Sequence, residues 1–266
     1  MRSKRASQPK GIGLPKNCVP TNPRCAGEGR SRMLVPEIYR CGSEIPHRLL
    51  MRENPLATLV TNGDPVPYAT RLAALIDPGT PETTPLVGAR IVCHMNQANP
   101  HWRALADGMP AKLMFDGPSK YVTPALYQTD PAAPTWDFVT AHVSGRLELV
   151  RDDDETLRIV HETADRLESA FGEGWDSTSS VGYFREILPG VGAFHLQIER
   201  VEAMYKLSQE KPDDVQERVI RRFEQDRDGN GRRLARLMRT LALGEASLGT
   251  PQLVRRGSPE PTPPPR

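Results

Sequence analysis

The sequence predicts a mainly β fold with peripheral helices (α+β), in which antiparallel strands close into a barrel. Two patterns lead to this prediction: several runs alternate between apolar and polar residues, and only a few segments have a helical apolar period. A third observation is that 266 residues with 38% hydrophobic content are enough to bury a core. Closure is favoured because a closed barrel leaves no unpaired sheet edge.

The strands are expected as β-rich or alternating runs between turn signals. Residues 56–61 form such a run, which the turn signal Asn62-Gly63-Asp64 ends, and a second strand follows over about 67–76. Further strands are expected over 88–96, 111–115, 138–150 and 193–204. In 138–150 the residues Val139, Ala141, Val143, Leu147 and Leu149 share one face, which is typical of a half-buried antiparallel strand.

Helices are expected in four places. A short helix over 45–53 closes at Asn54-Pro55, and Asn99 is a suitable N-cap for a helix with Pro100 in its first position. An apolar period over about 154–171 predicts an amphipathic helix that lies across the barrel. A charged helical region extends over about 212–243 and is broken at residues 228–231.

The chain divides into four segments: a disordered basic extension over 1–32, a barrel domain over 33–210, a helical segment over 211–249 and a disordered Pro-rich tail over 250–266. The net charge is +2, but the two ends contribute +7 and +2, so the body between them carries −7. A nucleic-acid partner is therefore not expected for the folded part. Two interpretations of residues 1–32 remain open: Met33 is the true translation start, or these residues form a genuine basic arm.

Other classes of site and location are disfavoured. The four cysteines show no CxxC spacing, so neither a disulfide framework nor a zinc site is expected. The stretch Asp226–Gly231 resembles the start of a calcium loop, but Leu237 stands where a bidentate Glu is required. No GxSxG, HExxH, P-loop or GxGxxG motif occurs. The chain shows no membrane-length apolar run and no secretory signal, so a cytoplasmic protein is expected.

His94 is the first candidate site residue. It ends a strand in which neither face is fully polar, the two faces being Ile91, Cys93 and Met95 on one side and Arg90, Val92 and His94 on the other. The second face is therefore expected to meet a subunit or a flat cofactor, with a structural histidine as the alternative.

Other polar residues are placed in or beside strands. Arg71 interrupts an apolar strand, and a buried Arg needs an anionic partner such as a carboxylate, a phosphate or a haem propionate. His101 lies one residue into a helix, where capping or a surface position is expected. His142 and His195 lie on the polar faces of strands, where solvent or subunit contact is expected.

Six segments together resemble the PaiB-like family, whose members are known as flavin-binding transcriptional regulators with a split β-barrel of the FMN-binding type. The resemblance covers about residues 33–220 and rests on the order and spacing of Leu34–Pro36, Asn54–Thr61, His94–Trp102, Phe115–Pro124, Pro134–Phe138 and Lys206–Gln209. It implies a homodimer with the cofactor between the subunits.

Two departures separate this chain from most of that family. It has Arg71 where the family usually shows a histidine, and Pro124-Ala-Leu-Tyr127 where the family shows Pro-Ser-Trp-Tyr. The segments 127–136 and 191–194, with Met95-Asn96, are more similar to the haem-dependent piperazate synthases. This resemblance implies haem b as cofactor, with FMN as the alternative. It also implies cyclisation of N5-hydroxy-L-ornithine to L-piperazic acid in nonribosomal peptide biosynthesis, with nitrogen–nitrogen bond formation and loss of water.

The resemblance also implies roles for individual residues. His94 is expected to be the axial ligand of the haem iron, with His142 and His195 in reserve. Arg71 and Arg90 are expected to pair with a propionate or the substrate carboxylate. The catalytic residues are expected to be His94, Arg71 and Tyr121. The pocket is expected to be lined as well by Met95, Trp136 and Lys206. The alternatives are an FMN-binding oxidoreductase and a PaiB-like regulator that contacts DNA through its basic arm.

Overall fold

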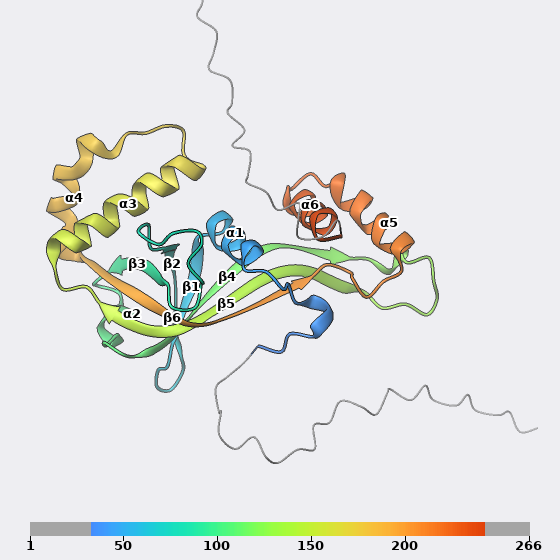
Figure 1. The fold of residues 1–266 in the computed structure, drawn as a ribbon, viewed down its shortest axis with the longest axis horizontal. Coiled ribbons are helices and arrows are strands. Elements are labelled where there is room, and N and C mark those ends of the chain that lie inside the picture. The colour runs from blue at the N-terminus through green and yellow to red at the C-terminus, as the bar shows by residue number, and fades with distance from the viewer. Residues whose placement is uncertain (1–32, 243–266) are drawn as a thin grey trace, which may run out of the picture. The chain divides into compact units, whose positions relative to one another are not determined.

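The computed structural model describes residues 33–242, and the predictions for 1–32 and 250–266 lie outside this range. Six antiparallel strands close into a barrel in the order β1-β2-β3-β6-β5-β4 (Figure 1). The predicted barrel with peripheral helices is therefore confirmed. The strands are β1 (Leu56–Thr61), β2 (Tyr68–Ile76), β3 (Arg90–Asn96), β4 (Pro110–Val122), β5 (Thr135–Leu149) and β6 (Val191–Lys206).

The helices lie in the connections and after the last strand. They are α1 (Ile45–Glu53), α2 (Pro100–Ala104), α3 (Asp153–Phe171), α4 (Val181–Ile187), α5 (Asp213–Glu224) and α6 (Asn230–Ala242), with short 3-10 turns at η1 (Glu37–Tyr39), η2 (Pro124–Leu126), η3 (Ser177–Ser180) and η4 (Leu188–Gly190). The predicted N-cap is confirmed, since the side chain of Asn99 accepts a hydrogen bond of 3.0 Å from the backbone N–H of His101. Helix α4 was not predicted. No helix within 33–242 is both long and apolar enough to cross a membrane.

The alternating strands bury one face in the barrel. The predicted face of β5 is confirmed, because Val139, Ala141, Val143 and Leu147 are all buried in the core. Helix α1 adds Leu50 and Met51 to the same core. Burying such side chains supplies most of the free energy that opposes the entropy of the unfolded chain.

The pair α5–α6 packs on the end of the ribbon formed by β4, β5 and β6. Val219 and Leu234 of this pair are fully buried in the core that the barrel shares. Lys120 of β4 forms ion pairs of 2.6 Å with Asp226 and 2.9 Å with Asp228. The stretch that resembles a calcium loop is thus the turn between two helices, and a lysine ammonium occupies its carboxylates. Figure 1 shows α1, α5 and α6 on one side of the ribbon.

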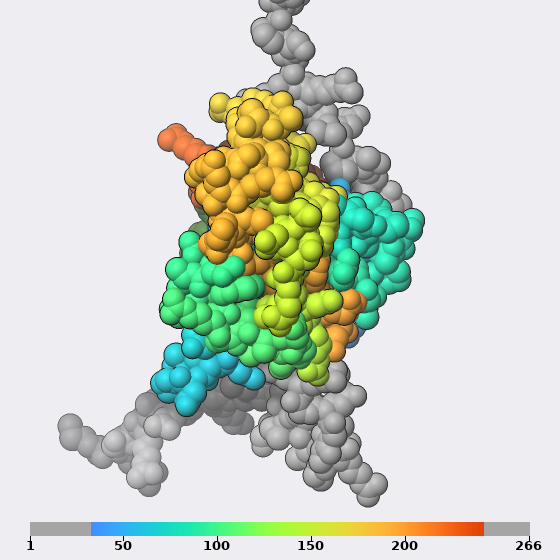
Figure 2. All heavy atoms as spheres, turned by 90° about the vertical axis from the view of Figure 1, so that its left-hand side faces the viewer, coloured from blue at the N-terminus to red at the C-terminus, as the bar shows by residue number. Residues whose placement is uncertain are grey.

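Helix α3 covers the outer face of the barrel where β2, β3 and β6 meet. Its fully buried Ile159 packs with Leu75, Val92 and Ala193, one residue from each of these strands. Figure 2 shows α3 and α4 on this side of the molecule, beside the loop between β2 and β3 in teal. The prediction that this amphipathic helix lies across the barrel is confirmed.

Candidate functional site

A row of outward-facing side chains crosses five strands of the barrel. Arg71 of β2 lies opposite Thr58 of β1, which lies opposite Met114 of β4. Met114 in turn lies opposite His142 of β5, and His142 opposite Glu202 of β6. Directly opposed residues of an antiparallel pair project to the same face. We call these five residues the outer row.

His94 belongs to the same outer surface. It projects to the same side of β3 as Val92. Strand β3 lies between β6, where Ala193 is opposite His94, and β2, which carries Arg71. Burial lowers the pKa of His94 below its ordinary value, so the ring is neutral at pH 7. Nδ1 is buried and has no hydrogen-bond partner within residues 33–242. A neutral imidazole with a free nitrogen is the form that binds metals.

Arg71 is exposed, so the prediction that it is buried was wrong. The strand alternation places it outward, opposite Thr58 of β1. Its guanidinium donates a hydrogen bond of 3.1 Å to the carbonyl oxygen of Leu56. It also lines an open pocket of about 330 Å³ with Glu53, Asn54, Pro55, Leu56, Asp116 and Phe171. Arg71 therefore has donors available for an anion that approaches this face.

The region around His142 contains several buried polar atoms without hydrogen-bond partners. They are Nδ1 of His142, Oγ of Ser144, Nε of Arg200 and Oε2 of Glu202, of which the last two form an ion pair of 3.6 Å with each other. Burial, with a smaller contribution from the charge of Lys112, lowers the pKa of His142. Unpaired buried polar groups cost free energy, and one explanation is an interaction that the single chain does not supply.

Met95 and Arg90 take no part in the outer row, although Arg90 lies on the same side of β3 as His94. Met95 is adjacent to His94 in the chain and therefore points the opposite way, into the barrel core, where its exposed fraction is 6%. Arg90 forms an ion pair of 2.9 Å with Asp77 near the beginning of β3. In a single chain, neither side chain contacts the outer row through any interaction that the structure contains.

Two other histidines are buried within the chain, although surface or solvent-facing positions were expected for both. His195 is 5% exposed beneath α3, with Nε2 at 3.5 Å from Glu155. His101 is 2% exposed and bonds the hydroxyls of Thr61 and Thr70, each at 2.9 Å. The expectation failed for His195 because α3 covers it, and for His101 because its ring packs against the barrel, stacked on Tyr68 of β2.

Tyr121, Trp136 and Lys206 lie together at the far end of the β4–β5–β6 ribbon. Tyr121 contacts Trp136 edge to face, with ring centroids 5.9 Å apart, and both rings are about half exposed. Lys206 donates a hydrogen bond to the hydroxyl of Thr135. These side chains share the outer face with His142, but Trp136 and His142 are separated by about 20 Å of strand. The predicted site residues thus form two groups within one chain.

Hydrogen bonds join the segments Pro134–Phe138 and Lys206–Gln209 on the other face of this ribbon. The hydroxyl of Ser208 donates to Asp137 at 2.7 Å, and Asp137 is completely buried. Burial raises the pKa of Asp137 to about 6, an effect that the nearby Glu210 increases and the hydrogen bond from Ser208 opposes. These two segments, 71 residues apart, therefore form one structural unit.

Several residues of the outer surface were not identified from the sequence: Thr58, Lys112, Met114, Ser144, Arg200 and Glu202. Each lies on the outer side of an alternating strand, so the periodicity did indicate its face. The pairing register decides which of these residues are neighbours, and the order β3-β6-β5-β4 cannot be read from the chain.

The family model described as "Putative FMN-binding domain" matches residues 33–200, which is more than half of the chain. The chain belongs to this family. Its closed six-stranded ring with peripheral helices is the split β-barrel of the FMN-binding type.

Among curated relatives of this FMN-binding family member, "Protease synthase and sporulation protein PAI 2" of Bacillus subtilis is 26% identical over 208 residues, which cover 77% of this chain and 96% of that protein. An uncharacterised protein of Emericella nidulans is 25% identical over 227 residues, with 71% of this chain and 90% of that protein covered. The predicted relationship to the PaiB-like family is thus confirmed.

Two solved structures show a more distant similarity. The FAD and haem binding protein of Mycobacterium smegmatis has a TM-score of 0.46 and 21% identity, covering 67% of this chain and 78% of that chain. The flavocytochrome Anf3 of Azotobacter vinelandii has a TM-score of 0.45 and 15% identity, covering 63% of this chain and 69% of that chain.

Proposed function

We propose that this member of the FMN-binding family is a haem-dependent piperazate synthase, which cyclises N5-hydroxy-L-ornithine to L-piperazic acid. The structural observation that supports the proposal is His94, a neutral imidazole on the outer face whose Nδ1 has no hydrogen-bond partner within residues 33–242. The resemblance of residues 127–136 and 191–194 to piperazate synthases supplies the reaction.

The residues of the outer face fit a haem group. His94 offers an imidazole nitrogen that would hold the haem iron, and it lies on β3 opposite Ala193 of β6. Arg71, exposed on the neighbouring strand, would pair with a propionate. In this arrangement His142 and His195 remain reserve ligands, of which only His142 lies on the uncovered part of the face.

The reaction requires a bond between two nitrogens that are both nucleophilic. The α-amino nitrogen attacks N5, the N5–O bond breaks, and the departing hydroxide takes a proton and leaves as water, so no external oxidant or reductant is needed. Bound haem would supply a Lewis acid that polarises the N–O bond. The chain would clamp the substrate carboxylate with Arg71 and exclude water from the reacting atoms.

We also propose that the working unit is a homodimer. Trp136 lies about 20 Å along β5 from His142, too far for one amino-acid substrate to contact both ends of the ribbon in one chain. A second copy that covers the outer row would bring its own Tyr121, Trp136 and Lys206 to this surface and give partners to the unpaired atoms around His142. The predicted catalytic role of Tyr121 depends on this assembly.

A flavin is the alternative cofactor, because the family description names FMN. Arg71 and Lys112 both lie on the outer face and are cations that a flavin phosphate would pair with. An FMN-binding oxidoreductase would use the same face. A PaiB-like regulator would instead require a DNA contact from residues 1–32.

One experiment separates these functions. The full-length protein is purified, its absorption spectrum is recorded before and after addition of haem b, and it is then incubated with N5-hydroxy-L-ornithine. We expect a Soret band and the formation of piperazic acid, which mass spectrometry detects. A flavin spectrum with no haem uptake would contradict the haem proposal. A Soret band without piperazic acid would contradict the synthase reaction alone.

A further inference from the structure

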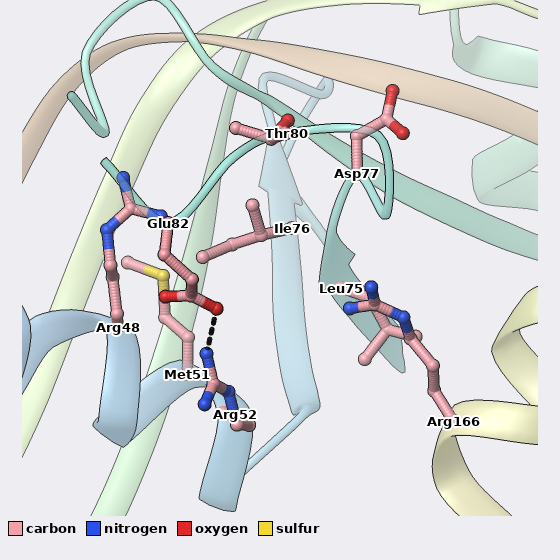
Figure 3. A pocket seen from close by; sticks show the side chains of 9 residues that line it. All are labelled: Arg48, Met51, Arg52, Leu75, Ile76, Asp77, Thr80, Glu82 and Arg166. Carbon is pink, nitrogen blue, oxygen red and sulfur yellow. Dashed lines mark hydrogen bonds and ion pairs between the residues drawn. The ribbon is translucent and has the colours of Figure 1, made fainter. Parts of the chain in front are cut away.

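A small pocket lies between α1, the end of β2 and α3, away from the outer row. It is lined by Arg48, Met51, Arg52, Leu75, Ile76, Asp77, Thr80, Glu82 and Arg166 (Figure 3). Three of these nine residues are arginines. Figure 3 shows Arg48 and Arg166 approaching the pocket from opposite sides, from α1 and α3.

Arg48 is a buried cation with no carboxylate partner among the described residues. Its exposed fraction is only 6%, and within residues 33–242 its guanidinium makes one hydrogen bond, to the carbonyl oxygen of Thr84. A guanidinium carries five N–H donors. A buried charge is costly unless an opposite charge or enough hydrogen bonds compensate it. The remaining donors of Arg48 therefore favour an anion in the pocket that it lines.

The two acidic residues of the pocket are already compensated. Glu82 pairs with Arg52, as the dashed line in Figure 3 marks. Asp77 pairs with Arg90 at 2.9 Å and accepts a hydrogen bond of 3.1 Å from the backbone N–H of Gly79.

Arg166 provides a second unpaired positive charge. Among the described residues it has no ion pair or side-chain hydrogen bond, and it is exposed. Once the pairs of Asp77 and Glu82 are set aside, Arg48 and Arg166 leave the pocket with an excess of two positive charges. Arginines on two sides of one pocket suit an oxyanion, because each can present two parallel N–H groups to it.

We infer that this pocket binds a small oxyanion, a carboxylate or phosphate group, between Arg48 and Arg166. The hydroxyl of Thr80 supplies a further donor on the rim, and Met51, Leu75 and Ile76 form an apolar wall. The volume of about 60 Å³ holds the anionic group of a ligand rather than a whole cofactor. The inference does not depend on whether the outer face binds haem or flavin.

Titration calorimetry on the full-length protein tests the site, with inorganic phosphate and acetate as probes and chloride to keep the ionic strength constant. The variants are Arg48→Met, which keeps the apolar stem, and Arg166→Ala. Arg236→Ala is the matched control, because Arg236 is an exposed arginine of α6 without a side-chain partner in the structure. Saturable binding is expected for wild type and control, with about tenfold or greater weakening in each test variant.

Each outcome decides one point. Binding of phosphate alone identifies a phosphate site, and binding of both probes identifies a general oxyanion site. The proposal is overturned if neither anion binds the wild type, or if Arg166→Ala binds as tightly as Arg236→Ala. Arg166 is exposed and its replacement leaves the core intact, so this second comparison remains decisive even if Arg48→Met fails to fold.

Discussion

The indole ring of Trp102 lies directly against the backbone of Gly192. A Cβ atom on this glycine would stand 2.4 Å from the ring, a distance that no real Cβ contact shows. Trp102 ends the segment His94–Trp102, and Gly192 lies in β6 opposite Met95. The two segments that support the family resemblance near His94 are therefore packed together, and the glycine is required for this packing.

Replacement of Gly192 by alanine is expected to destabilise the protein by about 1–3 kcal/mol, because the ring or β6 must move to make room. The control is Gly182→Ala in α4, where a Cβ meets nothing within 4 Å. This control is expected to leave the melting temperature unchanged or slightly higher, since alanine favours helix. Thermal unfolding followed by circular dichroism measures both, and equal melting temperatures for the two variants would contradict the packing argument.

The sequence predicts faces more reliably than it predicts neighbours. Strand alternation correctly assigned Val139 and Val143 to the buried face, because the two-residue period is a local property of the chain. Arg71 was wrongly expected to be buried, although its place in the strand alternation puts it outward. The burial of His195 was missed because it depends on where α3 packs. The row from Arg71 to Glu202 depends on strand order and register, which are set by contacts between distant parts of the chain.

His94→Ala is expected to abolish the Soret band after haem addition, or to weaken haem binding at least tenfold, because the variant lacks the imidazole nitrogen. Added imidazole should restore the band. His195→Gln is the matched control, since His195 lies beneath α3 and Nε2 faces Glu155. Absorption titration with haem measures both variants. If His94→Ala retains full haem affinity and His142→Ala loses it, the axial ligand is His142.

The wild-type protein is expected to have twice the mass of one 29.5 kDa chain in light scattering after gel filtration. Met114→Lys places a charge in the outer row between Thr58 and His142 and should give a monomer. Ile187→Lys makes the same kind of change on α4, where Ile187 is already 40% exposed, and should remain a dimer. A dimer that survives Met114→Lys and dissociates with Ile187→Lys would place the interface on α4.

Asp137 is expected to make stability depend on pH in the direction opposite to that of an ordinary surface carboxylate. Its exposed fraction is 0%, and burial raises its pKa to about 6, whereas the unfolded chain has the ordinary value of 3.8. The folded state therefore binds the proton more tightly. The contribution of protonated Asp137 to the free energy of unfolding is complete below pH 3.8 and is lost as the pH rises through about 6.

Asp137→Asn removes this titration and keeps an oxygen that can accept the hydrogen bond from Ser208. Relative to wild type, the variant should gain on the order of 3 kcal/mol between pH 4 and pH 7. Urea unfolding at unit pH steps measures the difference. Asp130→Asn, an exposed carboxyl, serves as the control and should follow the wild type at every pH. A constant difference between Asp137→Asn and wild type would show that Asp137 does not titrate in this range and would contradict the raised pKa.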